Sequence, residues 1–295
     1  MDDKLLFGLA VEPSFVALGD SFTEGLNDTE GLEGTGPGGV FRGWADRLAG
    51  LLAAEYSGIR YANLAVRGKL LRQIVADQVP VAAEMAPGLV SIAGGGNDLL
   101  RPGADPDVLA ELFDAAVARL RASGSQVLMF TGFDPVSVPV LRLLRGKIST
   151  FNMHLRGIAD EHDCYLVDLW SMRFLRSAGA WSSDRLHLTA QSHQRVALRA
   201  CEVLGVPVSA DWRAPLAVDE AAAAPANAGP ATVLPGTASA AVARAAWLAA
   251  RRADARWARE YLAPWVSRRL HGTSSGDGVT AKRPFLEPVP PPSAL

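Results

Sequence analysis

Short apolar runs typical of strands alternate with longer runs typical of helices between residues 14 and about 208. The strand candidates are Phe15–Leu18, Ile59–Leu64, Leu89–Ala93, Gln126–Thr131 and Tyr165–Leu169. The helix candidates are Trp44–Tyr56, Leu70–Met85, Asp107–Ala122, Lys147–Glu161 and Thr189–Leu204. Such alternation is typical of a parallel sheet with helices on both faces. Because crossovers are right-handed, we expect a three-layer α/β/α sandwich of the flavodoxin-like kind with a five-stranded parallel sheet.

The chain changes character after Trp212. Residues 214–240 are rich in Ala and Pro, which is typical of a linker without a core of its own. Residues 241–262 have a helical pattern, and a tail rich in Gly, Ser and Pro begins at His271. We therefore expect a first domain over residues 1–213, a linker over 214–240, and a C-terminal extension over 241–295 formed by a basic amphipathic helix and a Pro-rich tail.

The expected C-terminal helix carries aromatic side chains and basic charge. Trp247, Trp257 and Tyr261 fall on one face at helical spacing. One interpretation is contact with an anionic surface such as a membrane or nucleic acid. We favour the other, in which the aromatic face docks on the first domain or on a second subunit, allowing a homo-oligomer, while the arginines stay solvated. These are Arg244, Arg251, Arg252, Arg256 and Arg259.

The composition excludes several classes of protein. A formal net charge of −2 favours neither a nucleic-acid partner nor a strongly anionic substrate. No run approaches the ~20 apolar residues of a membrane span, and Met1-Asp2-Asp3-Lys4 lacks the basic start of a secretory leader. We expect a cytoplasmic protein without stable membrane insertion. Cys164 and Cys201 are distant in sequence, which predicts buried thiols and neither a disulfide nor a metal site.

Two polar residues come directly after strand candidates. Ser21 follows the first strand and a glycine, Gly19, and Asn97 follows the third strand and a run of three glycines. Open α/β sheets bind ligands beyond the carboxyl ends of their strands. The bland interpretations are that Ser21 caps a helix and that Asn97 belongs to a glycine turn. The glycine run lacks the spacing of a dinucleotide-binding or phosphate-binding loop, so no nucleotide cofactor is expected.

An aspartate and a histidine near the end of the first domain favour a catalytic role for Ser21 over a helix-capping role. Asp184 and His187 are three residues apart, so their side chains can approach each other. The carboxylate would orient the imidazole, which would then accept the proton of the serine hydroxyl. Asp184 could instead cap a turn near Thr189. Together with Ser21, however, the pair predicts a serine hydrolase, in which the Asn97 amide stabilises an oxyanion.

Four blocks, in this order and spacing, resemble those of the SGNH (GDSL-type) hydrolase family over residues 14 to about 208. They are Gly19-Asp20-Ser21, Asn63–Gly68, Gly95–Asp98 and Asp184–His187. A further stretch, Arg42–Leu48, is similar to soluble actinobacterial-type members. Three positions depart from the usual pattern, namely Phe22, Leu188 and Ser192, and none of them removes a reactive group.

The resemblance implies a role for each block. Ser21 would be the nucleophile, His187 the base and Asp184 the residue that orients it. The oxyanion would bind the amides of Ser21 and Gly68 and the side chain of Asn97. The family contains esterases, lipases, thioesterases and carbohydrate deacetylases that work without metal or cofactor. We therefore expect hydrolysis of a small-molecule carboxylic ester through an acyl-enzyme.

Other interpretations stay open. A non-catalytic module that binds a small molecule or a protein could keep the same crevice, and a flavodoxin-like cofactor binder follows from fold analogy alone. The Gly-rich, acidic segment Gly25–Val40 predicts either a mobile loop that shapes substrate access or a tolerated insertion. Its acidity hints at neutral substrates. The polar run from Asp160 to Cys164 has no accepted metal-ligand spacing, and we expect His154 and His193 to be structural.

Overall fold

Within the part of the chain that the structure describes, the central sheet has six strands in the order β5-β4-β3-β1-β2-β6, and the first five in sequence are parallel. A computed structural model describes residues 12–29, 41–137, 141–214, 240–264, 267 and 273–290. The strands are β1 (Ser14–Leu18), β2 (Arg60–Asn63), β3 (Leu89–Ile92), β4 (Gln126–Phe130), β5 (Tyr165–Val167) and β6 (Arg283–Pro288). The predicted α/β class and all five parallel strands are confirmed.

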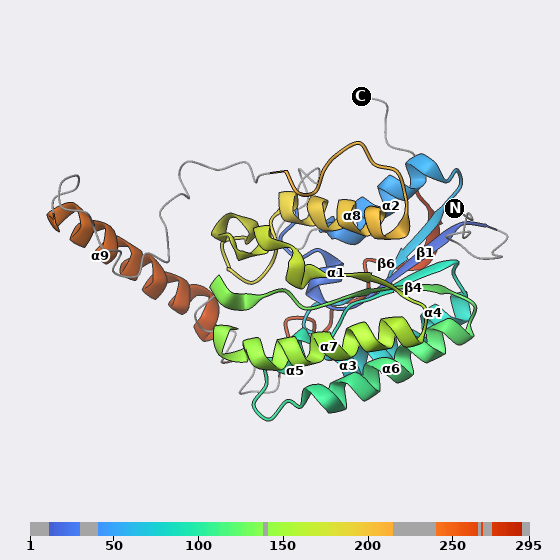
Figure 1. The fold of residues 1–295 in the computed structure, drawn as a ribbon, viewed down its shortest axis with the longest axis horizontal. Helices are drawn as coiled ribbons and strands as arrows, with labels where there is room; N and C mark the ends of the chain where they lie inside the picture. The colour runs from blue at the N-terminus through green and yellow to red at the C-terminus, as the bar shows by residue number, and fades with distance from the viewer. Residues whose placement is uncertain are drawn as a thin grey trace.

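Helices cover both faces of the sheet (Figure 1). Successive side chains of a strand point to opposite faces of the sheet, so the side chains of β1 belong to two hydrophobic cores. Phe15 and Ala17 pack with α2 and α8, whereas Val16 and Leu18 pack with α3, α4, α6 and α7. The helices of the sandwich are α1 (Ser21–Glu24), α2 (Gly43–Glu55), α3 (Leu71–Asp77), α4 (Val79–Met85), α5 (Gly96–Leu99), α6 (Pro106–Ala122), α7 (Arg145–Glu161) and α8 (Ala190–Leu204).

The single helix expected over Leu70–Met85 is two helices, α3 and α4, which meet at Gln78. Pro80 lies in the first turn of α4, where its missing N–H is tolerated, but it would break a continuous helix. At the break, the Gln78 side chain accepts from Gly19 N at 2.8 Å and donates to Gly19 O at 2.9 Å. The break thus supports the turn that precedes Ser21.

The Pro-rich tail contributes a strand that was not predicted from the sequence. β6 pairs antiparallel with β2 at the edge of the sheet. Two of its six residues are prolines, Pro284 and Pro288, and proline is tolerated in edge strands because one side of the strand needs no donors. The predicted five-stranded sheet is therefore extended by part of the expected C-terminal extension.

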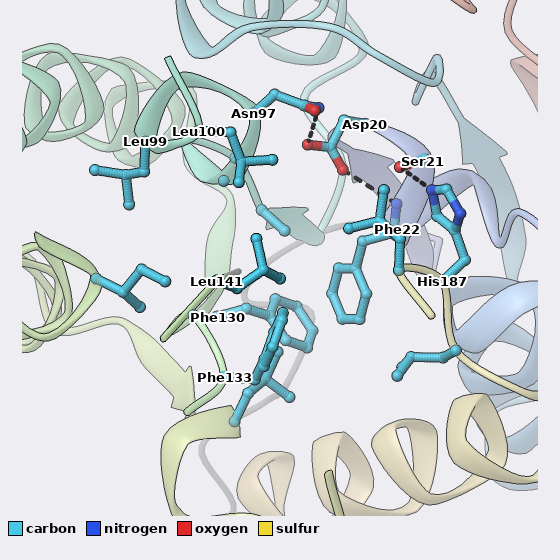
Figure 2. A pocket seen from close by; sticks show the side chains of 18 of the residues that line it. Asp20, Ser21, Phe22, Asn97, Leu99, Leu100, Phe130, Phe133, Leu141 and His187 are labelled. Carbon is cyan, nitrogen blue, oxygen red and sulfur yellow. Dashed lines mark hydrogen bonds between the residues drawn. The ribbon is translucent and has the colours of Figure 1, made fainter. Parts of the chain in front are cut away.

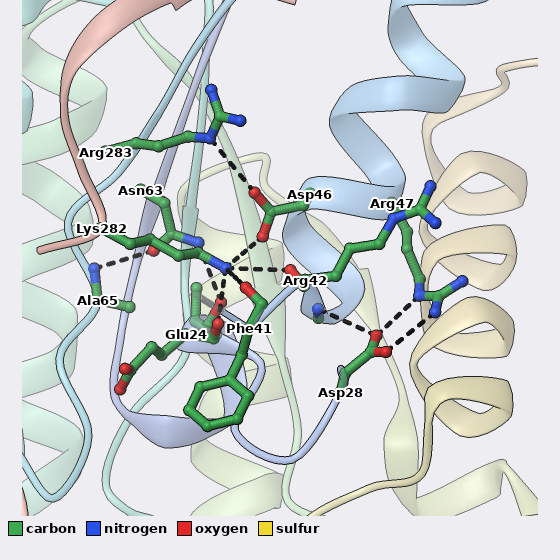
Figure 3. Close-up of polar contacts among 12 residues, drawn as sticks. Glu24, Asp28, Phe41, Arg42, Asp46, Arg47, Asn63, Ala65, Lys282 and Arg283 are labelled. Atoms are coloured by element: carbon green, nitrogen blue, oxygen red, sulfur yellow. Dashed lines mark hydrogen bonds and ion pairs between the residues drawn. The ribbon is translucent and has the colours of Figure 1, made fainter. Parts of the chain in front are cut away.

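Lys282, directly before β6, anchors the tail to the first domain (Figure 3). Its amine donates to the carbonyl oxygens of Glu24 and Phe41, each at 2.6 Å, and of Arg42 at 3.0 Å. It also forms an ion pair with Asp46, and its side chain is only 6% exposed. Burial lowers the pKa of Lys282, against the opposing effect of Asp46. A buried cation with this many acceptors fixes the tail in place.

Several expectations fall on parts of the chain that the structure describes only partly or not at all. Residues 30–40 of the predicted loop Gly25–Val40, and residues 215–239 of the predicted linker, lie outside the described residues. The division into domains stays a prediction. Asp28, expected on an acidic loop, is instead buried and forms an ion pair with Arg47 at 2.9 Å. None of the described helices is long and apolar enough to cross a membrane.

Candidate active site

Ser21 begins α1 directly beyond the carboxyl end of β1. The turn between them needs glycine at position 19, because a Cβ there would lie 2.5 Å from Thr23 Oγ1 and 2.8 Å from the Ala93 carbonyl oxygen. Asp20 caps the short helix by accepting from Phe22 N at 3.1 Å. The Ser21 side chain is thereby held at the edge of the sheet where ligands bind in open α/β folds.

The structure brings the three predicted residues of the acid–base chain together. Figure 2 shows the contact between His187 and Ser21. His187 Nε2 lies 3.0 Å from Ser21 Oγ, and His187 Nδ1 lies 2.6 Å from Asp184 Oδ2. With the Nδ1 proton bound to the carboxylate, Nε2 is free to accept the serine proton. Both side chains of the Asp184–His187 pair are 15% exposed, so the pair borders solvent without being immersed in it.

The Asp184 carboxylate collects donors from the loop that carries it. Oδ1 accepts from the backbone N–H groups of Leu186 and His187 and from Ser182 Oγ, and Oδ2 accepts from Asn27 Nδ2 at 2.7 Å. Burial acts to raise the pKa of Asp184, but the hydrogen bond and charge of His187 and the two backbone donors outweigh it. The pKa is therefore well below its usual value, and the group stays ionised. The cap of the following helix is Thr189 and not Asp184.

A second carboxylate, Asp20, lies on the other side of Ser21 and contacts Asn97. Asn97 Nδ2 donates to Asp20 Oδ2 at 2.9 Å and to the Lys69 carbonyl oxygen at 3.1 Å. Burial raises the pKa of Asp20 to about 6, although the backbone donor of Phe22 and the Asn97 amide act in the opposite direction. The carboxamide is thus oriented beside Ser21 by a partner that sequence reasoning did not assign.

Gly68 lies on a loop that is tied to the same turn. Val66 N donates to the Gly19 carbonyl oxygen at 3.3 Å, and Arg67 forms an ion pair with Glu24 of α1. Gly68 has a φ of +73°, which favours glycine, and a Cβ there would meet the Ser274 hydroxyl. Gly68 is not among the described residues that line the cavity beside Ser21. Its role as an amide donor stays a prediction.

A largely apolar cavity of about 190 Å³ opens beside the reactive groups (Figure 2). Ser21, Asn97 and His187 are polar residues of its wall. Apolar side chains come mainly from α5, the end of β4, the 3-10 turn η2 (Leu141–Leu144) and α7. They include Phe22, Leu99, Phe130, Phe133, Leu141, Ile148 and Phe151. The site can therefore hold an uncharged, apolar group next to the serine hydroxyl.

His154 and His193 behave as structural residues. His193 Nδ1 accepts from Trp44 N at 3.1 Å, and burial lowers the pKa of His193 to about 3, so it is neutral. It also borders the cavity. His154 pairs with Asp107 at the surface. No cluster of three or more His, Cys, Asp or Glu side chains suited to a metal ion occurs within the described ranges.

Sequence reasoning missed several residues that support the acid–base loop. Asn27 and Ser182 bind the Asp184 carboxylate, and the Trp257 indole donates to the Asp184 carbonyl oxygen at 2.9 Å. Asn27 is 157 residues from Asp184 in sequence, and no local pattern signals that pairing. The sequence placed Trp257 on one aromatic face with Trp247, but Trp247 is 59% exposed, and only the end of the helix contacts this loop.

Solved structures with the same fold include hydrolases of different kinds. LAE5, an alpha/beta hydrolase enzyme from the metagenome of Lake Arreo, is 22% identical with a TM-score of 0.56, covering 68% of this chain and 98% of its own. Axe2, an acetylxylan esterase from Geobacillus stearothermophilus, is 23% identical with a TM-score of 0.54, covering 66% and 95%. TesA is 24% identical with a TM-score of 0.51, covering 65% and 97%. Among curated proteins, none matches the sequence.

Fold and site geometry together define a hydrolase with a parallel α/β sheet. The sequence profile of the GDSL-like lipase/acylhydrolase family matches residues 17–195, and the chain belongs to this family. It is an enzyme of the esterase or lipase type. The match ends before the helix that carries Trp257 and before the tail that forms β6.

Proposed function

We propose that the protein hydrolyses carboxylic esters through an acyl-enzyme formed on Ser21. The observation that carries the proposal is the continuous hydrogen-bond chain from Ser21 Oγ through His187 to Asp184 Oδ2, with distances of 3.0 and 2.6 Å. A serine hydroxyl is a weak nucleophile until a base removes its proton, and this chain supplies the base and the group that orients it.

The chain supports two half-reactions. His187 Nε2 takes the proton of Ser21 as Oγ bonds to the ester carbonyl carbon, and the imidazolium then returns that proton to the leaving alkoxide oxygen as its bond to carbon breaks. In the second half, His187 takes a proton from water, whose oxygen bonds to the acyl carbon. Release of Ser21 with that proton gives the carboxylic acid. Asp184 stays ionised throughout and stabilises the imidazolium.

The oxyanion formed in each half-reaction is assigned to three donors. These are the amides of Ser21 and Gly68 and the Nδ2 group of Asn97. Support for Asn97 comes from its place in the cavity wall. In the resting site its two N–H groups bind Asp20 and the Lys69 carbonyl oxygen, so one of them turns to the oxyanion as it forms. One such donor stabilises the transition state by roughly 3–4 kcal/mol.

The cavity favours an acyl chain longer than acetyl. An apolar protein cavity of about 150 Å³ accommodates a benzene molecule, and the cavity beside Ser21 has a volume of about 190 Å³. A linear chain of roughly six to eight carbons would fill such a space. Its apolar walls offer few partners for sugar hydroxyl groups, so a lipophilic acyl ester fits this site better than an acetylated carbohydrate does.

The test is hydrolysis of nitrophenyl esters by the full chain and by Ser21→Ala. We expect the native protein to hydrolyse the series with kcat/KM rising from acetyl to octanoyl, and Ser21→Ala to be folded and inactive. Thr23→Ser, in the same short helix, serves as a control that should keep activity. Retained hydrolysis by Ser21→Ala would refute the nucleophile assignment. An inactive native protein whose Ser21 also resists a fluorophosphonate probe would favour the non-catalytic binding module.

We also propose that the protein is located in the cytoplasm.

A further inference from the structure

The acid–base loop, residues 182–188, is contacted on its outer side by the end of α9 (Ala240–Trp257) and the π-helical turn that follows it, Ala258–Leu262. Figure 1 shows α9 projecting from the sandwich, with only its C-terminal end close to it. Three consecutive loop residues each have a hydrogen-bond partner at this end. The pairs are Ser183 with Tyr261, Asp184 with Trp257, and Arg185 with Asp254.

The contacting residues form a single stripe on the helix. Asp254, Trp257 and Tyr261 follow one another at intervals of three and four residues, which places them on one side of the helix. They are partly buried, whereas Arg252 and Arg256 nearby are exposed. The stripe is therefore the docked side of this end of the helix, and the arginines at this end face solvent.

Trp257 holds the main chain of the loop at the residue that carries the reacting carboxylate. Its indole N–H donates to the Asp184 carbonyl oxygen at 2.9 Å. On the inner side of the loop, the carboxylate of the same residue binds His187 Nδ1 at 2.6 Å. A shift of the Asp184 main chain would therefore move the carboxylate relative to the imidazole.

The next residue shows why the loop needs support from outside. Arg185 has a φ of +56°, a left-handed conformation that is uncommon for a residue with a long side chain and persists when the surroundings hold it. Its guanidinium group lies over the Trp257 ring, 5.1 Å from the centroid, and forms an ion pair with Asp254 at 2.9 Å. Trp257 thus contacts both the carbonyl before Arg185 and the side chain of Arg185 itself.

We propose that Trp257 is a positioning residue that holds Asp184 in register with His187, so that the C-terminal helix is part of the catalytic apparatus of this chain. The proposal rests on the function assigned to Ser21, His187 and Asp184. It adds to that function a contribution from beyond residue 195, where the family match ends. The helix acts through the loop and does not touch the substrate.

The test compares Trp257→Phe with Trp247→Phe in the full chain. Trp257→Phe keeps an aromatic ring for Arg185 but removes the indole donor, whereas Trp247 lies on the same helix and is 59% exposed. For Trp257→Phe we expect kcat on a nitrophenyl ester to fall roughly tenfold, below the 10²-fold that a 1 Å misplacement can cost, with KM unchanged. Trp247→Phe should match the native protein. Equal kcat values for all three proteins would overturn the proposal.

A spectroscopic measurement separates positioning from a general loss of stability. The proton between His187 Nδ1 and Asp184 Oδ2 should give a far-downfield proton NMR signal, because the hydrogen bond is only 2.6 Å long. We expect this signal to shift or broaden in Trp257→Phe at a temperature where circular dichroism shows the variant fully folded. An unchanged signal with a lowered kcat would contradict positioning.

Ser21→Ala distinguishes failure of this proposal from failure of the proposed function. If Ser21→Ala is inactive while Trp257→Phe keeps the native kcat and NMR signal, only the role of Trp257 is wrong. If Ser21→Ala is active, the proposed function is wrong, and the role of Trp257 falls with it.

Discussion

The two carboxylates beside Ser21 differ in their surroundings, although both belong to aspartates in short polar segments. Asp184 is contacted by His187, two backbone N–H groups and the side chains of Ser182 and Asn27, and its pKa is lowered. Asp20 is buried with fewer donors, and burial raises its pKa to about 6. Burial acts to raise the pKa in both cases, and the number and charge of the donors decide the net direction.

This difference separates two roles. A carboxylate that remains ionised can stabilise an imidazolium, which is what general-base catalysis by His187 requires of Asp184. A carboxyl group that gains a proton near neutral pH is unsuited to that task, but as an acceptor it can fix the orientation of a neighbouring amide. Asp20 has that relation to Asn97. Substitutions at Asp184, Asn97 and Asp20 test this division of roles.

The largest effect is expected for Asp184→Asn. The amide would present a donor to His187 Nδ1 and favour the wrong tautomer, so kcat should fall roughly 10³- to 10⁴-fold. Steady-state kinetics on a nitrophenyl ester measure the change. Asp107→Asn is the matched control, because Asp107 also binds a histidine, His154, at 2.7 Å but lies at the surface far from Ser21 in sequence. Equal activity of both variants would remove Asp184 from the mechanism.

A smaller loss is expected for Asn97→Ala. If Nδ2 binds the oxyanion, kcat should fall roughly 10²- to 10³-fold while KM changes little, because the donor acts in the transition state. Asp98→Asn is a suitable control, since Asp98 is adjacent but its side chain accepts from Leu71 N. A rise in KM with kcat unchanged would show that Asn97 only binds substrate.

The smallest effect concerns the pH dependence of stability. Because the folded pKa of Asp20 is about 6 against an ordinary value of 3.8, the folded state binds more protons between about pH 4 and 6. Asp20 should therefore lower the free energy of unfolding as the pH rises through that window, by roughly 1–3 kcal/mol. Asp184 has a lowered pKa, so it stabilises the fold above about pH 4. This stabilisation is lost as the pH falls below 3.8, the ordinary pKa of an aspartate.

Urea unfolding of the native protein and of Asp20→Asn at pH 4.5 and 6.5 measures the Asp20 contribution. As the pH is raised from 4.5 to 6.5, the free energy of unfolding should fall more for the native protein than for the variant. If both proteins show the same difference, Asp20 does not titrate in this window, and the contrast with Asp184 is weaker than its surroundings indicate.

The sequence was sufficient for the parallel core of the fold but not for its edge. Strands buried on both faces appear as continuous apolar runs, such as Phe15–Leu18, and these were recognised. β6 contains prolines and lacks a regular alternation of apolar and polar residues. Its pairing depends on the Lys282 anchor and on an open edge at β2. Such a strand is defined by tertiary contacts and has no local signature.

The reactive residues were also more predictable than the residues that support them. Ser21 and Asn97 follow buried strands, and Asp184 and His187 are close in sequence, so their types and positions carried the prediction. The contacts of Asn27, Asp20 and Trp257 join distant segments. No periodicity connects these segments, and only the folded chain brings them together.

The most direct test of the central assignment is mass spectrometry of the intact protein during turnover of octanoyl nitrophenyl ester. The account predicts an acyl adduct that maps to Ser21, disappears as substrate is consumed, and does not form in Ser21→Ala. An adduct on another residue, or turnover by Ser21→Ala at the native rate, would contradict it.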